Sequence, residues 1–143
     1  MKHATIEQLP EIYQAFTSRK DFFPHIRKDY VERMINAHQC IYTHGVIVTY
    51  QKYKKSVRIG DVLIPAGSIM LHQILNTDQF NGKAHKVLKT FYSYVDADVY
   101  LSVRSDNKVA RTFYKRNGMK AVGKVSWSGG SLPGTVYLHK NDK

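Results

Sequence analysis

A short segment between a buried strand pattern and an amphipathic helix pattern has the residue types of an anion-binding site. The segment is Gln79-Phe80-Asn81-Gly82-Lys83-Ala84. The first backbone N–H groups of a helix have no acceptor within the helix, and together with the helix dipole they attract phosphate. Gly82 and the small Ala84 would let a ligand approach the backbone, and Lys83 and Lys86 would add positive charge. The pattern favours a phosphate-bearing ligand.

This segment does not match the common nucleotide-binding loops. It lacks the Gly-x-x-x-x-Gly-Lys-Ser/Thr string of a P-loop, and it has a single glycine where a Rossmann turn has several. A pattern of six residues also arises by chance, so on its own the segment is equally compatible with a surface turn. Its interpretation depends on a second segment downstream.

The second segment, Asn107-Lys108-Val109-Ala110-Arg111-Thr112-Phe113-Tyr114, again follows a strand pattern and is followed by Asn117-Gly118-Met119. With it, the chain resembles the GCN5-related N-acetyltransferase (GNAT) superfamily. Gln79 to Ala84 matches that family's Gln/Arg-x-x-Gly-x-Gly/Ala motif. The downstream segment matches its Asn-x-x-Ala-x-x-Phe-Tyr-x-x-x-Gly-Phe signature, with Met119 in place of the last Phe. The likeness in element order covers nearly the whole chain, and these two segments are its specific part.

The resemblance implies an acetyl-CoA-dependent N-acyltransferase that transfers an acetyl group to a primary amine by direct attack. The strand backbone at residues 72–74 would pair with the pantetheine arm, and the amides of residues 80–85 would hold the pyrophosphate. The cosubstrate-binding residues implied are His72, Gln73, Ile74, Gln79, Phe80, Asn81, Gly82, Lys83, Ala84, His85 and Asn107.

The resemblance also assigns Tyr114 as the general acid that protonates the departing thiolate. A phenol suits this role because its reference pKa is about 10, so that it keeps its proton at neutral pH and can hydrogen-bond a developing anion. The alternative interpretation of Tyr114 is a core aromatic beside Phe113.

The general base stays unassigned at this stage. Where some family members carry a glutamate on a central strand, five positions before Asn107, this sequence has Ser102. His72 titrates near neutrality and could accept the proton of the amine directly or through water. A packed or solvated histidine is the alternative.

Hydrophobic periodicity predicts the elements that must position these residues. Near the start of the chain, Thr5 and Gln8 are expected to form a capping box, with Pro10 in the first turn. The expected helices cover residues 6–16, 25–37, 82–95 and 107–116. The expected strands cover 40–42, 46–50, 69–75, 98–103, 121–127 and 135–139, with turns at His44-Gly45 and at Gly60-Asp61 and a loop over 128–134.

The order of these elements predicts an α/β mixture (α+β mixed) around one sheet. With the resemblance, this becomes the GNAT-like acyl-CoA N-acyltransferase fold, in which about four helices flank one central mixed, mostly antiparallel sheet. The length of 143 residues, with no repeat or linker, favours a single domain over 1–143.

The charge balance points to an anionic partner. Lys and Arg number 22 against 11 Asp and Glu, for a formal net charge of +11. Such a field attracts a phosphate-bearing cosubstrate, a nucleic acid or an acidic protein surface, and charge alone does not choose among them. For most individual lysines, solubility is a sufficient explanation.

Cysteine, histidine and hydropathy patterns set the remaining expectations. The single cysteine, Cys40, is expected as a buried strand thiol in a reducing compartment, and the seven histidines form no short ligand pair that would hold a metal. No apolar run has the length of a membrane helix. We therefore expect a cytoplasmic protein without a metal and without a membrane partner.

The sequence leaves two classes of function open. The first is the acetyltransferase, with an amine-bearing acceptor that the motifs do not specify. The second is a basic nucleic-acid-binding module, favoured by the stripe Lys108, Arg111 and Lys115 but disfavoured by the lack of a recognised DNA- or RNA-binding motif. A hybrid is a GNAT-type enzyme that modifies nucleic acid or a nucleic-acid-associated protein.

Overall fold

The computed structural model describes residues 1–78 and 82–142, and the chain divides into two compact units. Unit 1 comprises Met1–Tyr50 and Gln73–Thr90, and unit 2 comprises Gln51–His72 and Phe91–Lys143. Strand β5 (Ile69–Asn76) and helix α3 (Lys83–Val95) contribute residues to both units. The single domain expected over residues 1–143 stays a prediction.

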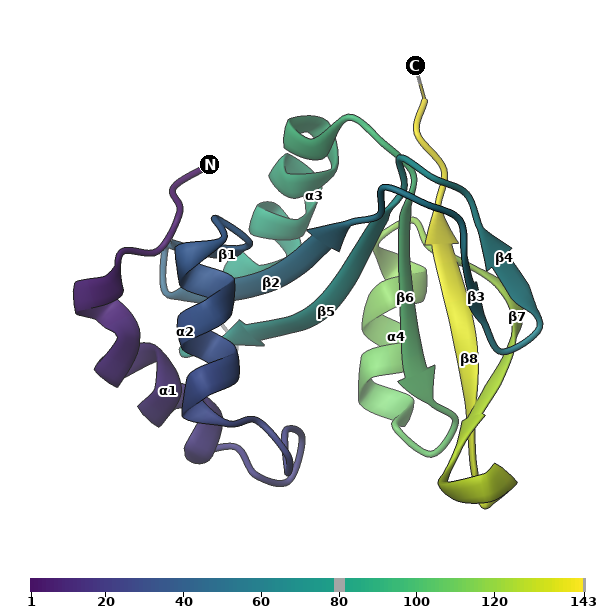
Figure 1. Ribbon diagram of the computed structural model, residues 1–143, viewed down its shortest axis with the longest axis horizontal. Helices are drawn as coiled ribbons and strands as arrows, with labels where there is room; N and C mark the ends of the chain where they lie inside the picture. Colours follow the sequence, from purple (N-terminus) through teal and green to yellow (C-terminus); the bar gives the residue numbers. More distant parts are fainter. Residues whose placement is uncertain (79–81, 143) are drawn as a thin grey trace. The chain divides into compact units, whose positions relative to one another are not determined.

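Two short amphipathic helices of unit 1 pack beside each other (Figure 1). A single 3-10 turn, η1 (Ile6–Gln8), leads into α1 (Leu9–Thr17), and the Thr5 amide donates to Gln8 Oε1 at 2.9 Å as one half of the predicted capping box. Helix α2 (Lys28–Asn36) begins three residues later than expected because Arg27 has an extended backbone (φ −105°, ψ 152°). Ile12, Phe16 and Val31 are fully buried in the core of this unit.

The strands of unit 1 begin with the predicted hairpin. Strand β1 (Cys40–Thr43) pairs antiparallel with β2 (Val46–Lys52), and Thr43 lies opposite Val46. His44 and Gly45 form the two-residue turn with φ values of 53° and 74°. Positive φ at both positions is the geometry that matches the twist of a two-residue hairpin, and glycine adopts it without strain. Cys40 on β1 is fully buried, as predicted.

Unit 2 is built on strands β6 (Val99–Arg104), β8 (Leu132–His139) and β7 (Lys120–Trp127), with β8 hydrogen-bonded to both of the others (Figure 1). Helix α4 (Lys108–Arg116) follows β6, and the turn η2 (Ser128–Gly130) joins β7 to β8. Along the sheet the strand order is β1-β2-β5-β6-β8-β7. β5 and β6 pair in parallel, while β1–β2, β6–β8 and β7–β8 are antiparallel. The predicted mixed, mostly antiparallel sheet and its four α-helices are confirmed for the described residues.

Strand β8 begins at Leu132, so the prediction of a loop through Gly134 is wrong. Trp127 lies opposite Leu132 in the β7–β8 register, and the indole ring lies where a side chain at Gly134 would project. Gly134 therefore acts as a strand residue that makes room for Trp127. Local sequence favoured a loop because glycine and proline are rare inside strands, and tertiary packing outweighed that preference.

A small second sheet covers part of unit 2. Strands β3 (Val57–Ile59) and β4 (Val62–Ile64) form an antiparallel pair around the predicted turn at Gly60-Asp61. Buried Ile64, Met70, Tyr100 and Val136 form one hydrophobic cluster, which joins this hairpin to the larger sheet. Among the residues described, no helix has the length and apolar character that crossing a bilayer requires.

Candidate active site

Strands β5 and β6 run side by side over a very short distance. Their parallel register holds two residue pairs, Ile69 with Val99 and Met70 with Tyr100, although β5 has 8 residues and β6 has 6. On its other edge, β6 pairs with β8 over its whole length. From Leu71 onward, the edge of β5 that faces β6 is therefore outside the β5–β6 pairing. Main-chain groups on an open strand edge can hydrogen-bond an extended ligand as if it were another strand.

His72 is the titratable residue on this open part of β5, within unit 2. Its side chain is exposed, and its Nε2 lies 3.3 Å from Gln51 Oε1. Desolvation by neighbouring protein atoms lowers the pKa of His72 from its ordinary value of 6.5. The imidazole is thus neutral at pH 7, which is the form that accepts a proton.

Gln73 and Ile74 continue β5 into unit 1. The Gln73 amide N–H donates to Thr49 Oγ1 at 3.1 Å. One of the backbone donors predicted for the pantetheine arm is therefore already used within the protein. Ile74 is half-buried.

Part of the predicted pyrophosphate loop falls outside the description. Gln79, Phe80 and Asn81 lie outside the described residues, and Gly82 is exposed with φ +73° directly before α3. An ideal Cβ at Gly82 meets no atom within 4 Å, so the glycine is needed for its backbone conformation and leaves open space beside it. Lys83, Ala84 and His85 form the first turn of α3, which contains no acidic residue.

Asn107 is the N-cap of α4. Its Oδ1 accepts a hydrogen bond from the Ala110 amide at 3.1 Å, which satisfies one of the free N–H groups at the start of the helix. The carbonyl end of this side chain is therefore occupied by the helix. The Asn107 amide nitrogen is the part of the side chain that such capping leaves for a ligand.

Tyr114 lies on the inner face of α4 and is 9% exposed. Its ring meets Phe113 edge to face, with 5.4 Å between the centroids. Burial raises the pKa of the Tyr114 hydroxyl above its ordinary value. The phenol therefore keeps its proton throughout the physiological range, as a general acid requires.

Tyr92 is a neighbour of Tyr114 that sequence reasoning missed. Burial raises the pKa of Tyr92, and the charge of an ionised Tyr114 would raise it further. The Tyr92 hydroxyl donates to the Asn117 carbonyl at 3.2 Å, and its ring stacks on His139 with 3.6 Å between centroids. Through these two contacts, Tyr92 of α3 connects to the end of α4 and to β8. The hydrophobic pattern of the expected helix over 82–95 did not single out Tyr92.

Comparisons with known proteins identify the fold. No protein-family model and no curated protein matches the sequence. A GNAT-family acetyltransferase structure from Streptococcus agalactiae superposes with a TM-score of 0.76 at 13% identity, covering 99% of this chain and 95% of that one. The ribosomal-protein-S18-alanine N-acetyltransferase of Escherichia coli superposes at 0.72 with 12% identity, covering 99% and 93%. The chain has the GNAT acetyltransferase fold.

The same GNAT fold occurs in a structure determined with the cosubstrate. NAA60 of Arabidopsis thaliana in complex with acetyl-CoA superposes with a TM-score of 0.68 at 14% identity, covering 97% of each chain. At such identities the similarity establishes the arrangement of helices and strands.

The basic stripe predicted on α4 is interrupted at its centre. Lys108 and Lys115 are exposed, but the Arg111 guanidinium donates to the Ser105 carbonyl at 2.9 Å and contacts the Tyr137 hydroxyl at 3.4 Å. Arg111 therefore ties α4 to the β6–α4 loop and to β8. This engagement weakens the nucleic-acid interpretation of the stripe.

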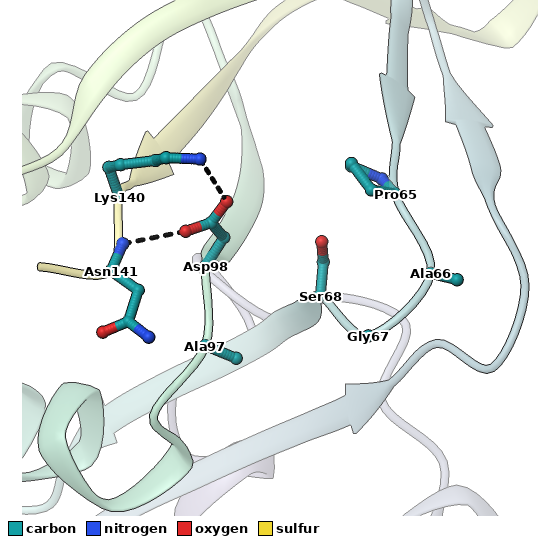
Figure 2. A pocket seen from close by; sticks show the side chains of 8 residues that line it. All are labelled: Pro65, Ala66, Gly67, Ser68, Ala97, Asp98, Lys140 and Asn141. Atoms are coloured by element: carbon teal, nitrogen blue, oxygen red, sulfur yellow. Dashed lines mark hydrogen bonds and ion pairs between the residues drawn. The ribbon is translucent and has the colours of Figure 1, made fainter. Parts of the chain in front are cut away.

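A hollow of about 290 Å³ lies elsewhere in unit 2, where β6 begins and β8 ends (Figure 2). Asp98 accepts hydrogen bonds from Lys140 Nζ at 3.0 Å and from the Asn141 amide at 2.8 Å. Burial alone would raise the pKa of Asp98, and these two donors outweigh it and lower the pKa. The hollow contains none of the predicted site residues, and no cluster of three metal-ligating side chains occurs in the described part of the chain.

Proposed function

We propose that this protein is an N-acetyltransferase that uses acetyl-CoA to acetylate a primary amine. The observation that carries the proposal is the short β5–β6 pairing within a GNAT fold, since it leaves the edge of β5 open from Leu71 onward. An extended pantetheine arm contains amide groups that can hydrogen-bond such an edge. His72 and Ile74 are the residues we propose for these bonds, together with the carbonyl of Gln73.

We propose that the start of α3 binds the pyrophosphate. Backbone N–H groups at a helix start attract an anion, and the first turn of α3 carries no acidic side chain that would repel it. The proposed residues are Gln79, Phe80, Asn81, Gly82, Lys83, Ala84 and His85. Separately, we propose that the side-chain amide nitrogen of Asn107 helps to position the cosubstrate. The net charge of +11 supports capture of a phosphate-rich cosubstrate.

The proposed reaction is a direct transfer of the acetyl group from the thioester to the amine. Acetyl-CoA supplies a thioester, whose carbonyl carbon forms a bond with the amine nitrogen as the carbon–sulfur bond breaks. We propose that Tyr114 donates its proton to the departing sulfur, since burial keeps that phenol protonated. The proton lost by the amine passes to solvent or to His72, which is neutral at pH 7.

Thermal unfolding with and without acetyl-CoA tests this proposal. A ligand that binds only the folded state adds roughly 2.7 kcal/mol at a hundredfold excess over its Kd. We expect acetyl-CoA to raise Tm and a short duplex oligonucleotide at low salt to raise it less. A shift with the oligonucleotide but none with millimolar acetyl-CoA would favour the nucleic-acid-binding module instead.

The remaining expectations are part of the same proposal. The acceptor is an amine-bearing molecule, and any nucleic-acid binding is nonspecific phosphate attraction that weakens steeply with salt. A cytoplasmic location agrees with a buried, unpaired thiol at Cys40.

A further inference from the structure

Three polar side chains meet inside unit 1 although they are far apart in sequence. The Tyr30 hydroxyl of α2 donates to Gln73 Oε1 of β5 at 2.9 Å. The Thr49 hydroxyl of β2 also bonds Gln73 Oε1, and the Gln73 amide N–H donates back to Thr49 Oγ1 at 3.1 Å. Thr49 is 0% exposed, whereas Tyr30 and Gln73 are half-buried.

This network fixes which end of the Gln73 side-chain amide faces outward. Thr49 Oγ1 already accepts the Gln73 N–H, so its own proton needs an acceptor in a fully buried place. The carbonyl end of the Gln73 amide can accept that proton, while the NH₂ end can only donate. Oε1 therefore faces Thr49 and Tyr30, and Nε2 faces the other way.

The Gln73 Nε2 group is a directed donor at the protein surface. It has no hydrogen-bond partner among the residues that the structure describes. Within that part of the chain, the single buried side-chain polar atom without a partner is His139 Nδ1, so Nε2 is accessible to solvent. Arg33 lies with its guanidinium carbon 5.9 Å from the centre of the Tyr30 ring and adds positive charge nearby. A ligand group at this place is therefore an oxygen acceptor and not a second cation.

The candidate acceptors also differ in how easily they lose a proton. Strands β5 and β6 contain no aspartate or glutamate, so no carboxylate on these strands is available as a base. The α-amino group of a peptide has a pKa near 8, against about 10.4 for a lysine side chain. At pH 7.5 roughly a quarter of α-amino groups are unprotonated, compared with about one lysine side chain in a thousand. An α-amine thus needs far less help from a base.

We propose that Gln73 Nε2 donates a hydrogen bond to the carbonyl oxygen adjacent to the attacking amine, so that the acceptor is the amino terminus of a peptide. This inference rests on the proposed function, because it places the acceptor beside the strand residues that we assign to the pantetheine arm. Tyr30 and Thr49 act through Gln73 as positioning residues.

The test compares three acceptors under steady-state conditions by release of free CoA thiol: a lysine-free peptide with a free amino terminus, an N-terminally blocked peptide with one lysine, and spermidine. The parent is expected to prefer the first. Gln73→Glu keeps acceptors for Tyr30 and Thr49 but lacks the donor, so KM for the free-amino-terminus peptide should rise by about tenfold. Tyr30→Phe should raise it less, and Gln14→Glu, which adds the same charge at an exposed site on α1, should leave it unchanged.

The outcomes separate this inference from the proposed function. Acetyl-CoA should raise Tm in the parent, in Gln73→Glu and in Gln14→Glu, because the Gln73 substitution keeps the main-chain carbonyl that we assign to the pantetheine arm. A shift in each variant verifies that it folds and binds the cosubstrate. Equal use of spermidine and peptide, or a Gln73→Glu variant that folds but keeps the parent KM, would overturn the inference while the acetyltransferase stands. Thiol release with none of the three acceptors and no shift with acetyl-CoA would overturn both.

Discussion

Tyr30 in unit 1 and Tyr114 in unit 2 are both helix tyrosines with raised pKa values, but their hydroxyl groups have different surroundings. Burial raises the pKa of Tyr30, and hydrogen bonds with Thr49 and Gln73 partly oppose that change. For Tyr114, burial raises the pKa without an opposing hydrogen bond. The Tyr30 hydroxyl donates to the half-buried Gln73 side-chain amide and orients it. A phenol that stays protonated because burial alone raises its pKa can donate its proton to a leaving group.

The strongest test of this contrast is to remove each hydroxyl in turn. Tyr114→Phe keeps the ring beside Phe113 but lacks the proton, and general acid catalysis contributes about a hundredfold to ten-thousandfold. We expect kcat to fall within or below that range while the Kd for acetyl-CoA changes little. Tyr30→Phe is the matched control and should change kcat by less than about tenfold. Equal kcat losses in the two variants, under conditions where chemistry limits the rate, would mean that the hydroxyl groups of Tyr30 and Tyr114 do not have different roles.

Cys40 reports whether unit 1 keeps its packing in such variants. Burial raises the pKa of the Cys40 thiol to about 12. Since an unperturbed thiol has a pKa of roughly 8.5, alkylation of the folded protein at pH 8 should be slower by about a thousandfold than in denaturant. Mass spectrometry after iodoacetamide treatment measures this rate. Rapid alkylation of the folded parent would contradict the burial, and rapid alkylation of Tyr30→Phe alone would mean that the variant has lost packing.

The start of α3 can be tested with a pair of substitutions at Gly82. Asp and Asn both tolerate a positive φ better than other side chains, and open space surrounds the position. Gly82→Asp adds a negative charge at the helix start, which should weaken acetyl-CoA binding by about fivefold relative to Gly82→Asn. Calorimetric Kd values measure the difference. Identical Kd values for the two variants would mean that the pyrophosphate is bound elsewhere.

The smallest expected effect is an acid-dependent loss of stability shared by the two units. Desolvation lowers the pKa of His3 in unit 1 and of His72 in unit 2 below the ordinary value of 6.5. The unfolded chain then binds more protons than the folded chain, so stability is full above pH 6.5 and falls as the pH drops through that value. Tm measured from pH 8 to pH 5 should decline, and His3→Gln and His72→Gln should each flatten part of the decline. A parent Tm that rises toward pH 5 would contradict these pKa directions.

Local signals in the sequence predicted much of this molecule. The His44-Gly45 turn and the helix expected over 107–116 depend on residues close together in the sequence, and both were predicted correctly to within one residue. The inward direction of Tyr114 followed from helical spacing on α4. These features need no knowledge of distant contacts.

Features that depend on distant contacts were not predictable. The Tyr30–Gln73 and Thr49–Gln73 hydrogen bonds join residues 43 and 24 positions apart. The early start of β8 follows from Trp127 packing on Gly134, which overrides local glycine and proline preferences. The engagement of Arg111 by Ser105 and Tyr137 is likewise a consequence of how α4 packs. The residues proposed to bind acetyl-CoA stay predictions, including Gln79, Phe80 and Asn81, which lie outside the described part of the chain.

The most direct test of the central claim is amine-dependent release of free CoA thiol from acetyl-CoA, followed by mass spectrometry of the amine. The panel contains α-amino peptides, lysine peptides, polyamines and aminoglycosides, each beside its amine-blocked form. An acetyltransferase of this kind should release thiol with at least one free amine, matched mole for mole by acetylated product, and should release none with the blocked form. Thiol release that does not depend on an amine, or no acetylated product with any amine in the panel, would contradict it.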